Sequence, residues 1–146
     1  MIPPRLRDTL VGVAARLATA ADPWWIITGA AVALHGVVTP MRDVDLLVSE
    51  PDARALLGAS GGPGEPGDRC RSAMFGHIGG LPLPVDVMAG FELFDGGEWR
   101  PVAFTTRNVM RVGPATVFVP ARAELAVLLA ALGRPKDLER LVMLAS

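Results

Sequence analysis

The chain has 146 residues, a length that suits one domain, and 51% of its residues are hydrophobic, which excludes a globally disordered protein. Its formal net charge of −1 excludes a general polyanion binder, so any attraction to RNA or DNA depends on local arginines. The single cysteine, Cys70, excludes an intramolecular disulfide and a cysteine-based zinc site, and it fits a cytoplasmic location.

The first predicted element is an amphipathic N-terminal helix within residues 1–20. Asp8 and Arg16 interrupt the apolar stretch that a secretory signal peptide requires. The apolar residues instead recur at the spacing of one helix face, at Leu6, Leu10, Val13, Ala14 and Leu17.

A second apolar segment, residues 23–41, approaches the length of a membrane span. Prolines and glycines interrupt it, and its composition changes from aromatic and β-branched over 24–28 to alanine- and leucine-rich over 30–37. We therefore predict a buried strand followed by a buried helix, and no contact with a membrane.

Residues 42–49 (RDVDLLVS) predict a strand of alternating character, and Pro51 begins a short helix over 52–57. The next segment, 58–68 (GASGGPGEPGD), predicts a flexible loop. A phosphate-binding loop would need a strand before it and a lysine-bearing helix after it, and the sequence has neither.

The second half of the chain predicts further strands and then a C-terminal helical pair over 121–146. The strands 71–78 and 83–88 are joined by a hairpin signal, Gly79-Gly80. Gly133 is placed to end one helix and Pro135 to begin the next. Other extended segments are 99–105, 108–112 and 115–119. The predicted fold class is α+β, a single domain over 1–146 with a mixed sheet and helices packed mainly on one face.

Three aspartates carry the strongest chemical signal. On a strand, Asp43 and Asp45 project to the same face with Cα atoms roughly 6.5 to 7 Å apart. Asp86 stands alone on one face of an apolar strand, so it joins the pair if the two strands are neighbours. Three carboxylates can hold two divalent ions such as Mg²⁺. The alternative is that these are ordinary aspartates on a solvent-exposed strand face. This interpretation is disfavoured because aspartate is a poor strand former.

A possible anion site follows the first strand, at Thr28-Gly29-Ala30. N–H groups at a helix N-terminus attract anions, and Gly29 lets a phosphate approach the backbone. The alternative interpretation is a tight strand-to-helix turn without a ligand.

Taken in order, these motifs resemble the nucleotidyltransferase superfamily typified by DNA polymerase β. The segments are GAAVALHG (29–36), TPMRDVD (39–45) and GRPKDL (133–138), and the likeness spans about 120 residues from Trp24 onward. The resemblance is closest to small bacterial minimal nucleotidyltransferases and to the AbiEii-like toxins. Three departures are a Gly-Ala pair in place of Gly-Gly or Gly-Ser, a threonine four rather than two residues before Asp43, and no lysine in the helix before the Lys136-Asp137 junction.

The resemblance implies a magnesium-dependent enzyme that binds a nucleoside triphosphate such as ATP. Asp43 and Asp45 would hold metal, and Asp86 would be a further ligand or the base for the acceptor. Lys136 or Arg134 would reach the triphosphate. The full set of implied nucleotide-binding residues is Thr28, Gly29, Ala30, His35, Arg42 and Lys136.

Two of these residues keep alternatives. His35 either orients Asp43 or the nucleotide, or it is a helix-terminal histidine bonded to backbone carbonyls. Arg42 is either an ion-pair partner of Asp43 or a phosphate contact. His77 is predicted to be a hairpin residue with no chemical role.

Three functions remain open at this point. The first is transfer of a nucleoside monophosphate from a nucleoside triphosphate to a hydroxyl of RNA, a protein or a small molecule. The second is an inactive binding module, such as a toxin–antitoxin component, that acts by homodimerisation or contact with a partner protein. The third and weakest is a metal-dependent hydrolase built from His35 and the three aspartates.

Overall fold

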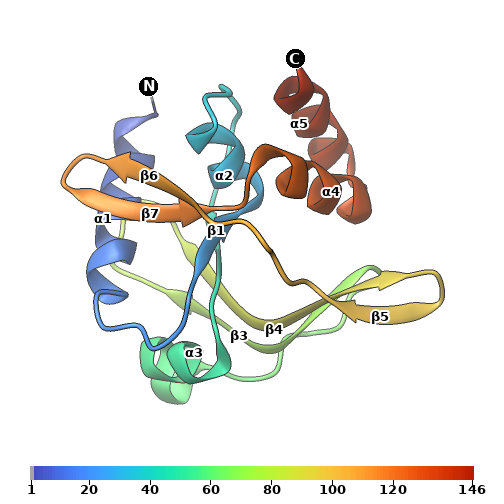
Figure 1. Cartoon of the computed structure of the whole chain (residues 1–146). Coiled ribbons are helices and arrows are strands. Elements are labelled where there is room, and N and C mark those ends of the chain that lie inside the picture. The colour runs from blue at the N-terminus through green and yellow to red at the C-terminus, as the bar shows by residue number, and fades with distance from the viewer. Residues whose placement is uncertain (1) are drawn as a thin grey trace.

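The computed structural model describes residues 2–146, and its centre is a mixed β-sheet (Figure 1). Its strands are β1 (Trp25–Ile27), β2 (Val44–Leu47), β3 (Cys70–Ile78), β4 (Val85–Asp95) and β5 (Glu98–Pro101). The strand order is β1-β2-β4-β3, and β5 pairs with the far end of β4. Strands β2 and β4 run parallel, whereas all other pairs in this sheet are antiparallel.

The helices lie on both sides of this sheet, most of them on one. They are α1 (Pro4–Arg16), α2 (Thr28–Leu34), α3 (Glu50–Leu57), the 3₁₀ turn η1 (Gly58–Ser60), α4 (Arg122–Leu132) and α5 (Pro135–Ala145). In Figure 1, α2, α4 and α5 stand above the sheet and α3 lies below it. A separate ribbon of β6 (Asn108–Val112) and β7 (Ala115–Val119) packs against α1. The α+β class predicted from the sequence is confirmed.

Helix α1 buries the face that its apolar periodicity predicts, with Leu6, Leu10 and Val13 in the core. Its polar residues hold the connection that leads into β4. The Thr9 hydroxyl accepts the N–H of Leu83 at 3.0 Å, and the Arg5 guanidinium donates to the carbonyl of Pro82 at 2.7 Å. Because Asp86 follows this connection directly, α1 helps fix where β4 begins.

Helix α2 starts at Thr28 and ends at Leu34, two residues earlier at its start and three earlier at its end than predicted. Its small residues are buried nearly throughout, so α2 packs closely between the sheet and the C-terminal helices. The Arg122 guanidinium donates to the carbonyls of His35 and Leu144, both at 2.6 Å. This arginine therefore joins the C-terminal ends of α2 and α5.

The glycine-rich segment 58–68 differs from the prediction of a flexible loop. It begins with η1, and Gly62 then exchanges two backbone hydrogen bonds with Phe75 at 2.7 and 3.1 Å. Gly64 donates to the carbonyl of Ser72 at 3.2 Å. Strand β3 is at the edge of the sheet, and its unpaired backbone groups bind this segment, which has too few side chains to obstruct the approach.

The strand predicted over 99–105 is shorter, because the chain leaves the sheet after β5 and crosses to β6. The Glu124 carboxylate of α4 holds this crossing by accepting the N–H groups of Thr105 and Thr106, at 2.9 and 2.7 Å. At the end of the chain, Gly133 has a φ of 64° and ends α4, and Pro135 begins α5, both as predicted.

Within residues 2–146, none of the helices has both the length and the apolar composition that a bilayer span requires.

Candidate active site

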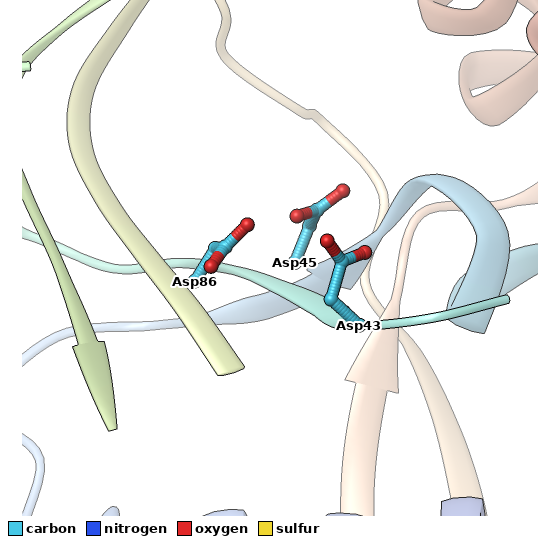
Figure 2. Close-up of side chains that lie close together, drawn as sticks. All are labelled: Asp43, Asp45 and Asp86. Carbon is cyan, nitrogen blue, oxygen red and sulfur yellow. The ribbon is translucent and has the colours of Figure 1, made fainter. Parts of the chain in front are cut away.

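The structure brings the three predicted aspartates together at one end of the parallel strand pair. One carboxylate oxygen from each of Asp43, Asp45 and Asp86 lies within 4.8 Å of the others. Figure 2 shows the three side chains pointing to the same side of the sheet, two from the β2 segment and one from β4. The chain thus has a compact group of acidic oxygen atoms of the kind that binds a divalent ion.

Strand pairing explains this convergence. Asp45 and Asp86 are register partners in the parallel pair β2–β4, so their side chains lie side by side on one face. Their neighbours Val44 and Val85 are buried on the opposite face and fix the orientation of both strands. Strand β2 is shorter than predicted, and Asp43 stands just before its first residue instead of on it.

The electrostatics of the group centre on Asp45. Burial raises its pKa from 3.8 to about 6, and the negative charges of Asp43 and Asp86 add to this rise. The hydroxyl of Thr28 and the charge of Arg134 act in the opposite direction. Asp45 therefore has an unfavourable charged state, which a bound cation would stabilise.

Thr28 is held in an unusual conformation beside this carboxylate. Its φ of 54° is the only positive value for a non-glycine residue within 2–146, and its side chain is buried. The hydroxyl lies within hydrogen-bonding distance of the Asp45 carboxylate and, at 2.8 Å, of the Ile27 carbonyl. Because β1 pairs with β2 and places Ile27 opposite Asp45, the turn into α2 delivers Thr28 to the acidic group.

A cleft of about 450 Å³ opens beside Asp43 and Asp45. Its walls come from the start of α2, the loop before β2 and the start of α5. Besides these two carboxylates, the lining carries a third acidic side chain, Glu139, and four cationic ones, Arg42, Arg134, Lys136 and Arg140. A cleft that combines acidic groups with several cations suits a ligand that combines phosphates with a divalent ion.

The junction between α4 and α5 positions two of these cations. Asp137 is fully buried and accepts hydrogen bonds from the Arg134 Nε at 2.6 Å and Nη2 at 3.1 Å, and from the Arg134 backbone N–H at 3.2 Å. This bonding raises the pKa of Arg134 above its ordinary value, and Asp45 contributes to the same rise. Lys136 remains exposed between the two bonded residues and lines the cleft.

Gly29 and Ala30 occupy the predicted turn at the start of α2. A side chain at Gly29 would lie 2.8 Å from the Arg140 guanidinium carbon, so the glycine gives this arginine room. Ala30 is buried and, unlike Thr28 and Gly29, does not line the cleft.

His35 lies outside the cleft. A ring nitrogen of His35 is 2.8 Å from the carbonyl of Pro120, which is the backbone contact that the second interpretation of this residue predicts. A hydrolase site that combines His35 with the three aspartates is therefore not formed. Arg42 does line the cleft, and within 2–146 it forms no ion pair with Asp43.

Two residues near the site were missed in the sequence. Arg140 donates to the carbonyl of Pro40 at 2.8 Å, and it lies one helical turn after Lys136, a spacing that indicates a shared face. The other is His77, whose Nδ1 lies 2.7 Å from Asp86. Only the register of β3 against β4 reveals this contact, and a glycine-rich connection does not define that register.

The fold is similar to solved structures of nucleotidyltransferases. A candidate nucleotidyltransferase from Thermotoga maritima matches with a TM-score of 0.77 at 20% identity, over 97% of this chain and 93% of that chain. The antibiotic-resistance factor ANT(2'')-Ia matches with a TM-score of 0.60 at 14% identity, over 95% of this chain and 82% of that chain. The structure of ANT(2'')-Ia in complex with adenylyl-2''-tobramycin matches with a TM-score of 0.57 at 14% identity, over 95% of this chain and 87% of that chain.

No protein-family model and no curated protein matches the sequence. The structural likenesses show that this chain has the nucleotidyltransferase fold, as its motifs predict.

Proposed function

We propose that this chain is a metal-dependent nucleotidyltransferase, which transfers a nucleoside monophosphate from a nucleoside triphosphate to an acceptor hydroxyl. The observation that carries the proposal is the arrangement of Asp43, Asp45 and Asp86 beside a cleft that carries four cationic side chains, within this fold. We further propose that residues 1–146 act as one domain in the cytoplasm.

The donor set fits magnesium. All three side chains offer carboxylate oxygen atoms, the hard ligands that Mg²⁺ prefers, and the group includes no softer nitrogen or sulfur ligand. Magnesium bound there would supply positive charge to the triphosphate and favour ionisation of the acceptor hydroxyl.

The protein's own residues would then bind and orient the substrates. Lys136, Arg140 and Arg42 line the same cleft as Asp43 and Asp45, so they would hold the phosphates. Thr28 would orient Asp45 through its hydroxyl, and Gly29, which lines the cleft, would let a phosphate approach the backbone.

The acceptor class is open among RNA, proteins and small molecules. Because ANT(2'')-Ia was solved with adenylyl-2''-tobramycin, an aminoglycoside is a reasonable first small-molecule acceptor to test. Total tRNA and the protein itself are the matching probes for the other two classes.

Nucleotide transfer with α-³²P-labelled ATP, GTP, CTP or UTP and Mg²⁺ tests the proposal. We expect one pairing of nucleotide and acceptor to give a labelled product with the wild type and none with Asp43→Asn. Asp43 is exposed, so the variant should keep its melting temperature. Transfer by the variant at the wild-type rate would reject the assignment of the carboxylates.

A second candidate function is an inactive binding module, including a toxin–antitoxin component of the AbiEii-like kind. It is favoured by exposed apolar side chains on the two C-terminal helices, with Val127 70%, Leu138 45% and Val142 68% exposed. Calorimetry separates the two functions, because an inert module gives no Mg²⁺-dependent heat with any of the four nucleotides.

A further inference from the structure

The third carboxylate of the acidic group is bonded to a histidine that the proposed function does not use. His77 and Asp86 are register partners in the antiparallel pair β3–β4, and the His77 Nδ1 lies 2.7 Å from an Asp86 carboxylate oxygen. Within residues 2–146, this is the only hydrogen bond in which the Asp86 side chain takes part. Within this part of the chain, His77 is therefore the residue placed to orient the Asp86 carboxylate.

The direction of this bond follows from the chemistry of the two groups. An ionised carboxylate only accepts hydrogen bonds, so the His77 Nδ1 carries the proton and donates it. A carboxylate has several acceptor sites, which leaves oxygen lone pairs of Asp86 available to a cation. The ring of Phe75 meets the His77 ring edge to face at a centroid distance of 5.1 Å and limits its rotation.

The exposure of the pair argues against a purely structural role. The His77 side chain is 66% exposed and that of Asp86 21% exposed, and such pairs contribute about 0 to 1 kcal/mol to folding. A bond that adds little stability but fixes one member of an acidic group resembles the outer contacts that orient metal ligands.

The strand order places the pair at the far side of the acidic group from the cleft. The cleft is lined by Asp43 and Asp45 but not by Asp86 or His77. Strand β4, which carries Asp86, lies between β2 and β3, and β3 carries His77. His77 can therefore act on Asp86 without obstructing the proposed nucleotide cleft.

We propose that His77 is a positioning residue that orients the Asp86 carboxylate toward a metal ion shared with Asp43 and Asp45. This inference rests on the proposed function and deepens it. Through its Nδ1–H, His77 selects one orientation of Asp86, while its outer ring edge remains open to solvent.

Three substitutions of His77 distinguish the contributions of its two ring nitrogens, Nδ1 and Nε2. In His77→Asn the amide occupies the position of Nδ1 and can still donate to Asp86. In His77→Gln the amide lies further out, at the position of Nε2, and His77→Leu removes both donors. If Nδ1 is the operative atom, asparagine restores function and glutamine does not.

The readout is the affinity for Mn²⁺, measured by calorimetry and by the paramagnetic resonance of the free ion. We expect His77→Leu and His77→Gln to bind Mn²⁺ about tenfold more weakly than the wild type, and His77→Asn to bind close to the wild type. In a transfer assay, the leucine variant should lose kcat while the KM for the nucleotide stays unchanged.

A matched control is Arg111→Leu, which places leucine on an exposed strand position of β6, outside the cleft and the carboxylate group. It should bind Mn²⁺ like the wild type, and all variants should keep the wild-type melting temperature. Equal Mn²⁺ affinity of the wild type and His77→Leu would overturn the inference alone. Absence of Mn²⁺ binding by the wild type would overturn both the inference and the proposed function.

Discussion

Replacing Asp45 with asparagine should stabilise the metal-free fold while it abolishes metal binding. Asp45 is the member of the acidic group whose charged state the fold disfavours most clearly, because burial and two neighbouring carboxylates raise its pKa to about 6. Asparagine has nearly the same shape, carries no charge, and can still accept the Thr28 hydroxyl. The substitution therefore removes the charge with little change in packing.

The magnitude follows from the pKa shift of Asp45. The rise from 3.8 to about 6 is about 2 pH units, and each unit corresponds to about 1.4 kcal/mol. A carboxyl group whose pKa is raised by folding stabilises the protein in its protonated form, and this contribution is lost as the pH rises through 6. Above pH 7, Asp45→Asn should therefore raise the free energy of unfolding by about 3 kcal/mol. Near pH 3.5 the two proteins should be equally stable.

Urea denaturation of the metal-free wild type and variant, across pH 3.5 to 8, measures this difference. Asp95→Asn is the matched control, because the Asp95 side chain is 77% exposed and its substitution should change stability by less than about 0.5 kcal/mol. Added Mn²⁺ should stabilise the wild type and leave Asp45→Asn unchanged. The reasoning is refuted if Asp45→Asn is no more stable than the wild type at pH 8 without metal.

Three further predictions concern the neighbours of this group. Thr28→Val removes the hydroxyl that lowers the pKa of Asp45, so the acid limb of Mn²⁺ binding should move up by about one pH unit, whereas Thr28→Ser should leave it in place. Glu124 has its pKa lowered to about 2 by hydrogen bonds from the two threonines before β6, so its stabilising effect is present above pH 4.5 and lost as the pH falls toward 2. At pH 7, the free energy of unfolding of Glu124→Gln, measured with urea, should thus be about 1 kcal/mol lower than that of the wild type. Near pH 2 the two proteins should be equally stable, and an equal difference at both pH values would contradict this. Lys136→Gln should weaken Mg²⁺–ATP binding in calorimetry by about tenfold at low salt with no change in melting temperature, and unchanged affinity would remove this lysine from the phosphate contacts.

Much of the local structure follows from the sequence because its causes lie within a few residues. The spacing of leucines in α1, the glycine that ends α4 and the proline that begins α5 each act through nearby sterics and burial. The acidic pair Asp43 and Asp45 stands out for an equally local reason. Aspartate is unusual in an apolar strand-forming segment, and this signal does not depend on the rest of the chain.

Other features of the site required the folded chain. His35 was a candidate nucleotide contact, yet it bonds to Pro120, which is 85 residues away in sequence. The segment 58–68 has the composition of a free loop, but the edge of β3 pairs with it. In both cases the partner lies elsewhere in the sequence, and no local pattern predicts which backbone groups will remain unpaired.

By itself, the sequence determined most of the strands and helices, and that three aspartates stand out in otherwise apolar segments. Only the tertiary structure decided that β2 and β4 are parallel neighbours, that Asp86 therefore lies beside Asp45, and that His77 lies opposite Asp86. The physical reason is that periodicity and turn chemistry act over a few residues. Strand partners and register depend on how the whole chain buries its apolar surface at once.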